Sequence, residues 1–139
     1  MIKVTLDTNV LISGTFWTGD SFRIMGLIDK NQIQCILSKD IIAEYNLVLA
    51  SQEIIEKIAA KDLTLSDVSH KVVSKSIIVE PKLRLKVVKA DAGDDKILEC
   101  AKAGKADYLI SSDKHLLALG GFEGIRIITP HEFLKIWKI

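Results

Sequence analysis

Four acidic residues stand where an apolar segment of the chain begins or ends, and they are Asp7, Glu44, Asp95 and Asp113. Asp7 directly follows the apolar run IKVTL, and Asp113 follows the run YLIS after one further serine. Such runs are typical of strands buried in a parallel sheet, whose ligands bind beyond the carboxyl ends of the strands. Converging carboxylates repel one another unless a cation compensates them, and Mg²⁺ and Mn²⁺ prefer oxygen ligands. The pattern therefore predicts a divalent metal site.

Each of these acids also has an ordinary structural explanation. An Asp after a strand commonly forms a turn or caps a helix, an Asp in a first helical turn favours the helix dipole, and a Glu beside an apolar stripe commonly reaches solvent. Glu44 borders the apolar stripe of a helix predicted over 38–50, with Ser38 as its N-cap. Asp94 and Asp95 open another predicted helix. The conjunction of the four acids, rather than any one of them, favours a metal site.

The elements that must position these acids alternate between strand and helix patterns, which predicts βαβ units and a parallel sheet. Strands are predicted over 2–6, 33–37, 77–79, 108–111 and 125–128, and helices over 21–30, 38–50, 52–60, 64–74, from 94 onward, 114–119 and 130–137. The expected fold class is α/β, a three-layer α/β/α sandwich around a central parallel sheet of about five strands. The length of 139 residues, 48% of them apolar, suits a single domain over 1–139.

Composition excludes several classes of protein. The net charge of +1 does not suit a protein that coats nucleic acid, so any contact with nucleic acid must be local. Cys35 and Cys100 lie in apolar patterns without a zinc-binding spacing, which indicates reduced core residues and favours the cytosol. No apolar stretch is long enough to span a membrane, and Asp7 interrupts the only candidate for a signal peptide. The sequence predicts a soluble, cytoplasmic protein.

Five segments together resemble one known family. They read DTNVLIS from Asp7, SKDIIAEY around Glu44, DAGDDKILECA before and after Asp95, ADYLISSDKHLLAL around Asp113, and GIRIITPHEFL near the end of the chain. In this order and with these elements between them, they resemble the PIN-domain ribonucleases, and especially the VapC-like toxins of bacterial and archaeal toxin–antitoxin pairs. The resemblance covers essentially the whole chain.

The resemblance implies both a site and an activity. It makes Asp7, Glu44, Asp95 and Asp113 the metal-binding and catalytic acids, sets the strand before Asp7 beside the strand before Asp113, and implies one or two Mg²⁺ or Mn²⁺ ions. Auxiliary residues that would support the site are Thr8, Asn9, Asp94 and Ser111. The implied activity is endonucleolytic cleavage of RNA that leaves a 3′-hydroxyl, and the implied protein partner is an antitoxin.

Two features depart from the common pattern of this family. His115 occupies a position where many relatives carry a further Asp, and Asp91 and Asp94 make the region before Asp95 unusually acidic. The number of metal ions therefore stays open.

A basic segment and two aromatic residues are candidates for contacting RNA. Basic side chains alternate with apolar ones just before the acidic helix, and they are Lys82, Arg84, Lys86 and Lys89. They would form a phosphate track or would keep an edge segment soluble. Phe16 and Trp17 are expected in the loop after Asn9, where they would stack on a base, pack against the next helix, or form a homodimer contact.

Two other function classes compete with a nuclease. A Mg²⁺-dependent phosphatase or phosphotransfer domain also places an Asp after its first strand, but normally with a second acid two residues later, where this chain has Asn9, and no Gly-rich phosphate loop is present. A non-catalytic module of the same fold would bind RNA or a protein. Such a module has no electrostatic reason to keep four clustered carboxylates.

Overall fold

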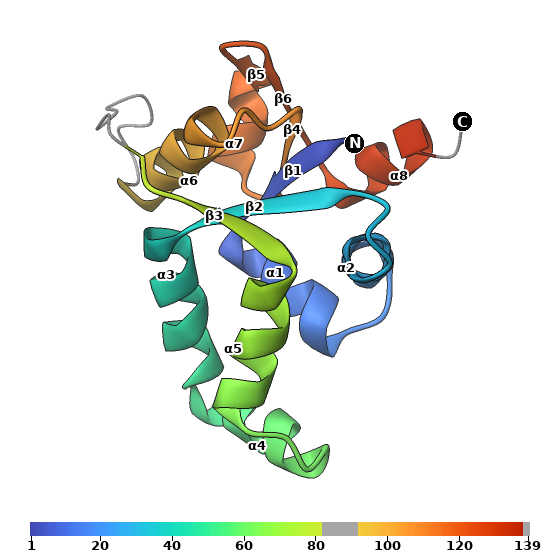
Figure 1. Ribbon diagram of the computed structural model, residues 1–139, viewed down its shortest axis with the longest axis vertical. Coiled ribbons are helices and arrows are strands. Elements are labelled where there is room, and N and C mark those ends of the chain that lie inside the picture. Colours follow the sequence, from blue (N-terminus) through green and yellow to red (C-terminus); the bar gives the residue numbers. More distant parts are fainter. Residues whose placement is uncertain (82–91, 138–139) are drawn as a thin grey trace.

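The strands form one mostly parallel sheet in the computed structural model, which describes residues 1–81 and 92–137 (Figure 1). The sheet contains β1 (Lys3–Leu6), β2 (Gln34–Ser38), β3 (Ser76–Val79), β4 (Tyr108–Ile110), β5 (Gly121–Phe122) and β6 (Ile125–Ile128). The strand order is β3-β2-β1-β4-β6-β5, and every pairing except that of β5 with β6 is parallel. The predicted α/β class and the predicted parallel strands are confirmed.

Strand β5 was not predicted, and it makes the sheet six-stranded rather than five-stranded. It pairs antiparallel with β6 through a turn at Glu123 and Gly124, whose φ angles are 47° and 86°. Two consecutive residues with positive φ match the tight turn that suits the twist of a hairpin. A strand of two residues is too short to show an alternating pattern, so the sequence does not predict it.

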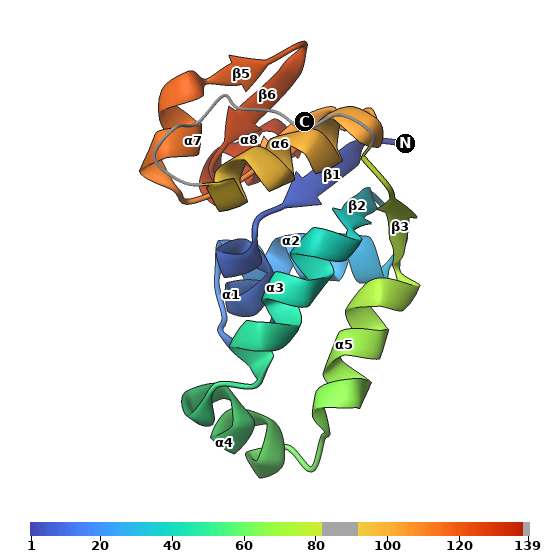
Figure 2. The ribbon, with the colours of Figure 1, turned by 90° about the vertical axis from the view of Figure 1, so that its left-hand side faces the viewer.

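Eight helices surround the sheet within the described residues. They are α1 (Thr8–Phe16), α2 (Asp20–Asp29), α3 (Lys39–Leu49), α4 (Gln52–Ala60), α5 (Leu65–Ser74), α6 (Ala92–Ala103), α7 (Lys114–Leu119) and α8 (Pro130–Trp137). Helices α1, α2 and α3 lie on one side of the sheet and α6 on the other, so the three-layer arrangement is confirmed (Figures 1 and 2). Helices α4 and α5, together with the end of α3, project away from the sheet as an arm (Figure 2).

Helix α1 corrects one prediction. Phe16 and Trp17 were expected in a loop, whereas Phe16 is the last residue of α1 and Trp17 is its C-cap. The buried residues of α1 include Val10, Leu11 and Ile12 in succession, so they do not form a stripe along one face. A helix that is apolar on several sides lacks the periodicity by which an amphipathic helix is recognised.

The core lies between the sheet and the helices on its two faces. Ile97, Leu98 and Ala101 of α6 are buried, at the spacing of residues on one face of a helix. Cys35 and Cys100 are both buried and free of disulfides, in agreement with the predicted reduced core residues. Burial raises the pKa of the Cys35 thiol to about 11 and that of Cys100 to about 12, which keeps both thiols protonated and unreactive. No helix in the described ranges is long and apolar enough to cross a membrane.

Candidate functional site

The acids at the ends of two strands are neighbours because β1 and β4 pair in parallel. The register aligns Leu6 with Ile110, and the backbone N–H of Asp7 donates a hydrogen bond to the carbonyl of Ile110 at 3.2 Å. Asp7 and Asp113 therefore emerge at the same edge of the sheet, between its two central strands. The predicted adjacency of these strands is confirmed, and it places both acids where ligands of open α/β sheets bind.

Asp7 is a buried carboxylate whose two oxygens are both hydrogen-bonded. It is the N-cap of α1, where Oδ1 accepts from the backbone N–H of Val10 at 2.8 Å and Oδ2 accepts from the hydroxyl of Ser111. Its side chain is only 8% exposed. Burial raises the pKa of Asp7 above 3.8, the nearby charge of Asp113 raises it further, and the hydrogen bonds from Ser111, Val10 and Ser112 partly offset this rise. A cation beside Asp7 would relieve this cost.

Asp113 is joined to Asp7 through one serine. The Ser111 hydroxyl donates to Asp7, and its oxygen accepts from the backbone N–H of Asp113 at 2.9 Å. Asp113 in turn caps α7, because its Oδ1 accepts from the backbone N–H groups of His115 at 2.7 Å and Leu116 at 3.2 Å. Ser111 is fully buried, so this link is held rigidly. His115 donates to this cap through its backbone, and its side chain is exposed.

Helix α6 brings Asp94 and Asp95 to the same edge of the sheet. The helix precedes the parallel strand β4, so its last residues lie at the amino edge of the sheet and its first turn, which contains both acids, lies at the carboxyl edge. Adjacent residues of a helix point about 100° apart, so one of the two acids would be expected to be more buried than the other. Their exposures are nevertheless equal, at 8% each, so burial does not distinguish them.

Glu44 lies nearer to solvent than the other three acids. Ser38 caps α3 at the end of β2, through a hydrogen bond from the backbone N–H of Ile41, as the sequence predicted. Glu44 follows on this helix, and its side chain is exposed. Helix α3 contacts α1 and α6, so it adjoins the helices that begin at Asp7 and carry Asp95. Of the auxiliary residues on α1, Thr8 is buried and Asn9 is exposed.

The structure links two of the four acids, Asp7 and Asp113, through the Ser111 hydroxyl, and the other two lie on helices α3 and α6. In residues 1–81 and 92–137, no three Asp, Glu, His or Cys side chains lie close enough together to hold a metal ion. The hydrogen-bonded set is Asp7, Ser111 and Asp113. The atoms of this set that could bind a metal are carboxylate and hydroxyl oxygens, which suit a hard divalent cation better than a soft one.

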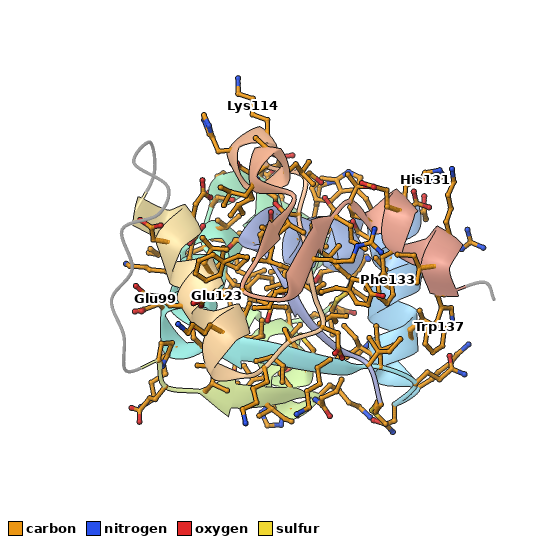
Figure 3. The ribbon with its side chains drawn as sticks, turned by 90° about the horizontal axis from the view of Figure 1, so that it is seen from above. Glu99, Lys114, Glu123, His131, Phe133 and Trp137 are labelled. Carbon is orange, nitrogen blue, oxygen red and sulfur yellow. The ribbon has the colours of Figure 1, made fainter. Side chains whose placement is uncertain are left out.

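Glu99 is a buried acid that the sequence analysis did not single out. It is 5% exposed and lies on α6 (Figure 3), one helical turn after Asp95 in the sequence. Residues four apart on a helix are neighbours, so the spacing of Asp95 and Glu99 was the signal in the sequence that could have revealed it.

The predicted RNA-contacting residues fall into two groups. The basic residues Lys82, Arg84, Lys86 and Lys89, like Asp91, lie outside the described residues. Trp17 is 42% exposed, and the ammonium of Lys57 on α4 lies 4.9 Å from the centre of its ring. Asp7 and Trp17 cap the two ends of α1, which separates them by about 15 Å along the helix axis. Trp17 therefore packs toward the arm rather than beside the acids.

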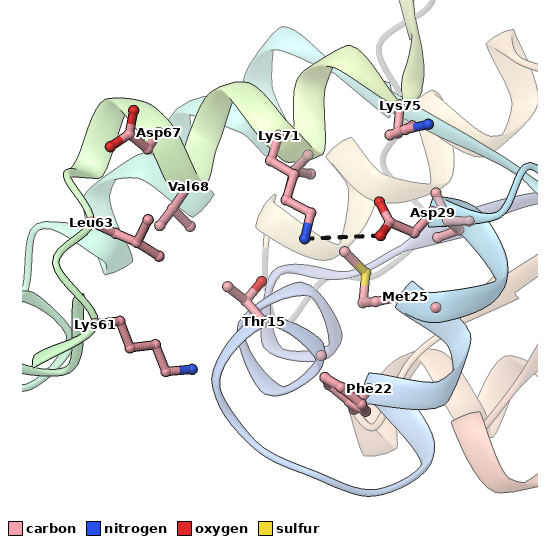
Figure 4. A pocket seen from close by; sticks show the side chains of 14 residues that line it. Thr15, Phe22, Met25, Asp29, Lys61, Leu63, Asp67, Val68, Lys71 and Lys75 are labelled. Carbon is pink, nitrogen blue, oxygen red and sulfur yellow. Dashed lines mark ion pairs between the residues drawn. The ribbon is translucent and has the colours of Figure 1, made fainter.

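A separate cavity of about 460 Å³ lies between α1, α2 and α5 (Figure 4). Met25, Leu63 and Val68 contribute apolar surface, and Lys71 forms an ion pair with Asp29 across the cavity at 3.9 Å. None of the four candidate acids lines this cavity. Its apolar lining does not resemble a phosphodiester site.

Comparison with known proteins places the chain in a family. No curated protein sequence matches it at a significant level. Among solved structures, it is similar to a chain in the crystal structure of VapBC2 from Rickettsia felis bound to a DNA fragment from the promoter. The TM-score is 0.59 and the sequence identity is 14%, and the match covers 91% of this chain and 97% of that chain. This similarity shows a shared fold. A model of the PIN domain matches residues 3–115, and the chain therefore belongs to the PIN domain family.

Proposed function

We propose that the chain is a metal-dependent endoribonuclease and the toxin of a toxin–antitoxin pair. The observation that carries this proposal is the pair of Asp7 and Asp113, linked through the buried Ser111 beyond the two central strands. Membership of the PIN domain family supports a nuclease. An unneutralised buried carboxylate with a raised pKa is costly, and a bound cation gives a physical reason for keeping it.

The four candidate acids would hold one or two Mg²⁺ or Mn²⁺ ions. Such an ion would bind the scissile phosphate and lower the pKa of an attacking water. Asp7 and Asp95 would be its primary ligands. Asp113 and Glu44 would complete the shell directly or through water, and the exposed Glu44 would be free to orient the attacking water. Ser111 would be a positioning residue, because its hydroxyl holds the Asp7 carboxylate in one orientation.

An antitoxin is the proposed protein partner. The solved relative is a complex named VapBC2 bound to promoter DNA, which supports a second protein in the functional unit. The toxin would act on RNA in the cytosol, with or without forming a homodimer. A non-catalytic RNA- or protein-binding module is the alternative, but it would be more stable with an amide in place of the buried carboxylate of Asp7. A phosphatase is less consistent, because the exposed Asn9 lies in α1 where a second acid would be needed.

Cleavage of single-stranded RNA by the purified chain tests this proposal. We expect cleavage with Mg²⁺ or Mn²⁺ and none in excess EDTA. Asp7→Asn and Asp95→Asn should each lower the rate by about 100-fold or more, as expected for loss of a metal ligand. Asp94→Asn is the matched control, because Asp94 is equally buried on the same turn, and it should lose about tenfold or less.

Two outcomes would contradict parts of the proposal. Robust cleavage in EDTA that survives both Asp7→Asn and Asp113→Asn would exclude a metal-dependent nuclease at these acids. A loss in Asp94→Asn that equals or exceeds the loss in Asp95→Asn would overturn the assignment of Asp95 as the primary ligand on α6.

A further inference from the structure

Helices α2 and α8 pack against each other (Figure 1). The side chains of these two helices leave a shallow groove of about 330 Å³ between them. Its apolar surface includes Phe22 and Leu27 from α2 and Leu134 and Trp137 from α8. Residues three apart on a helix are neighbours, so Leu134 and Trp137 present one continuous face of α8 to the groove. This groove is distinct from the cavity beside α5, although Phe22 and Gly26 border both.

The described residues that line the groove carry only positive charges. Arg23 and Lys30 line it and both are exposed, and within residues 1–81 and 92–137 no acidic residue lines it. Neither makes an ion pair with any residue in the described ranges. They lie two helical turns apart on α2, about 10 Å along its axis, so they would neutralise separate phosphates of one strand. The cavity beside α5 differs, because Asp29 and Asp67 contribute to its lining.

Two aromatic rings accompany these cations. Phe22 is 52% exposed although it is a large apolar residue. The ring of Trp137 stacks on the buried Phe133, with 6.5 Å between ring centres and 15° between ring planes (Figure 3). Phe133 also makes an edge contact with Tyr108, which fixes its own position. Trp137 itself is half-buried, so Phe22 is the exposed ring of the groove and Trp137 is a partly accessible one. A basic groove with accessible aromatic rings is the arrangement that binds single-stranded nucleic acid without base-specific contacts.

The groove begins at the same edge of the sheet as the acids. Helix α8 starts directly after β6, whose last residue, Ile128, accepts a hydrogen bond from the backbone N–H of Ser111 at 3.0 Å. His131 and Asp20, whose side chains approach to 3.4 Å, join the first turns of α8 and α2. Strand β6 is two strands from β1, about 10 Å. A strand bound at Asp7 and Asp113 would therefore reach the groove within a few nucleotides.

We propose that the groove between α2 and α8 binds a single-stranded segment of the RNA substrate next to the cleavage site. Arg23 and Lys30 would contact its phosphates, and Phe22 and Trp137 would stack on its bases. This inference rests on the proposed ribonuclease function, and it adds a binding surface to that site.

Binding of a fluorescein-labelled oligouridylate of about twelve nucleotides, measured by anisotropy in EDTA, tests the groove apart from catalysis. In Arg23→Gln/Lys30→Gln, the dissociation constant should rise about tenfold or more at low salt. The salt slope should fall by about 1.4, as expected for two lost phosphate contacts on a single strand. The control for loss of charge is Lys102→Gln/Lys105→Gln at the end of α6, on the other side of the sheet. It removes the same charge, together with the ion pair of Lys102 with Glu123, and it should bind the oligouridylate nearly as the parent does.

The aromatic part of the proposal has its own readout. Phe22→Leu keeps an apolar side chain but removes the ring, and it should weaken binding about fivefold or more. In a Trp17→Phe background, the remaining tryptophan is Trp137, and the oligouridylate should quench its fluorescence. Circular dichroism melts would check that each variant folds as the parent does.

The outcomes separate this inference from the proposed function. RNA binding that depends on Arg23 and Lys30, without cleavage in Mg²⁺, would support the groove and contradict the nuclease. Cleavage by the parent, with unchanged binding and cleavage in the groove variants and no quenching of Trp137, would support the nuclease and overturn the groove. If the groove variants bind RNA as tightly as the parent but no longer bind a protein partner, the groove belongs to that partner and the inference is overturned.

Discussion

Asp7 combines a structural and a chemical role in one side chain. Its Oδ1 caps α1, and its Oδ2 accepts the Ser111 hydrogen bond, so the carboxylate contributes to local order. Its burial and the charge of Asp113 nevertheless raise its pKa, which means that the ionised form is less favourable in the folded state than in the unfolded state. The capping explanation and the metal-ligand explanation of this residue are therefore compatible.

Replacing Asp7 with Asn should raise the melting temperature of the metal-free protein at neutral pH. Because the folded-state pKa is raised above 3.8, the folded protein holds the proton more tightly, and ionisation costs stability in full above the folded-state pKa. The melting temperature should rise by about 3 °C for each kcal/mol that Asp7→Asn adds to the free energy of unfolding. This rise should become smaller as the pH falls toward 3.8, where the carboxyl of the parent becomes protonated. Calorimetry from about pH 3 to about pH 8 would measure it, across the range where carboxylates titrate.

The Ser111→Ala variant is the matched comparison for Asp7→Asn. It removes the hydroxyl that links Asp7 and Asp113 but keeps both charges, so it should lower stability rather than raise it. A lower melting temperature in metal-free Asp7→Asn would contradict the prediction, and it would mean that the carboxylate acts mainly as a hydrogen-bond acceptor.

At the scale of elements, the packing of α6 on the sheet depends on a small residue after its last turn. A side chain on Gly104 would place its Cβ 2.2 Å from Cγ2 of Ile36, a buried residue of β2. A branched core side chain cannot move away as the end of a flexible chain would. The absence of a side chain at Gly104 therefore lets the end of α6 lie close to β2.

Two glycine-to-alanine variants should change stability in opposite directions. Gly104→Ala should lower the free energy of unfolding by about 1–3 kcal/mol, because it overpacks the contact with Ile36. Gly26→Ala, in the interior of α2, meets no atom within 4 Å and should raise it by about 0.4–1 kcal/mol. Urea unfolding of both variants would measure the difference. Equal stabilisation in the two would show that α6 has room at this point.

For the molecule as a whole, the linked acids predict that a divalent cation stabilises the fold. A ligand that binds only the folded state at about 100 times its dissociation constant adds about 2.7 kcal/mol. Mg²⁺ should therefore raise the melting temperature of the parent by several degrees, at about 3 °C for each kcal/mol. KCl at the same ionic strength is the control. In Asp7→Asn, the rise in melting temperature caused by Mg²⁺ should be mostly lost. A response to KCl that matches the response to Mg²⁺ would indicate screening of charges rather than a site.

Local patterns in the sequence determined most of the elements and the position of each acid at an element's end. The N-cap at Ser38, the capping box of Thr129 and Glu132, and the buried stripe of α6 follow from residues within one or two helical turns of one another. The two-residue β5 lacked such a pattern, and so did α1, whose buried residues do not form a stripe along one face. The hydrophobic periodicity of a helix or a strand becomes visible only over several residues. It carries no information about which distant residues become neighbours in the fold.

Only the tertiary structure decided which of these residues meet. The hydrogen bond from Ser111 to Asp7 joins residues 104 positions apart, and it exists because β1 and β4 pair in parallel although α1 to α6 separate them in the chain. The groove between α2 and α8 likewise joins Arg23 and Lys30 to Trp137 across most of the sequence. These residues become neighbours because both faces of the sheet are buried by helices from distant parts of the chain. The raised pKa of Asp7 has the same origin, because it depends on burial by long-range packing rather than on local residue types.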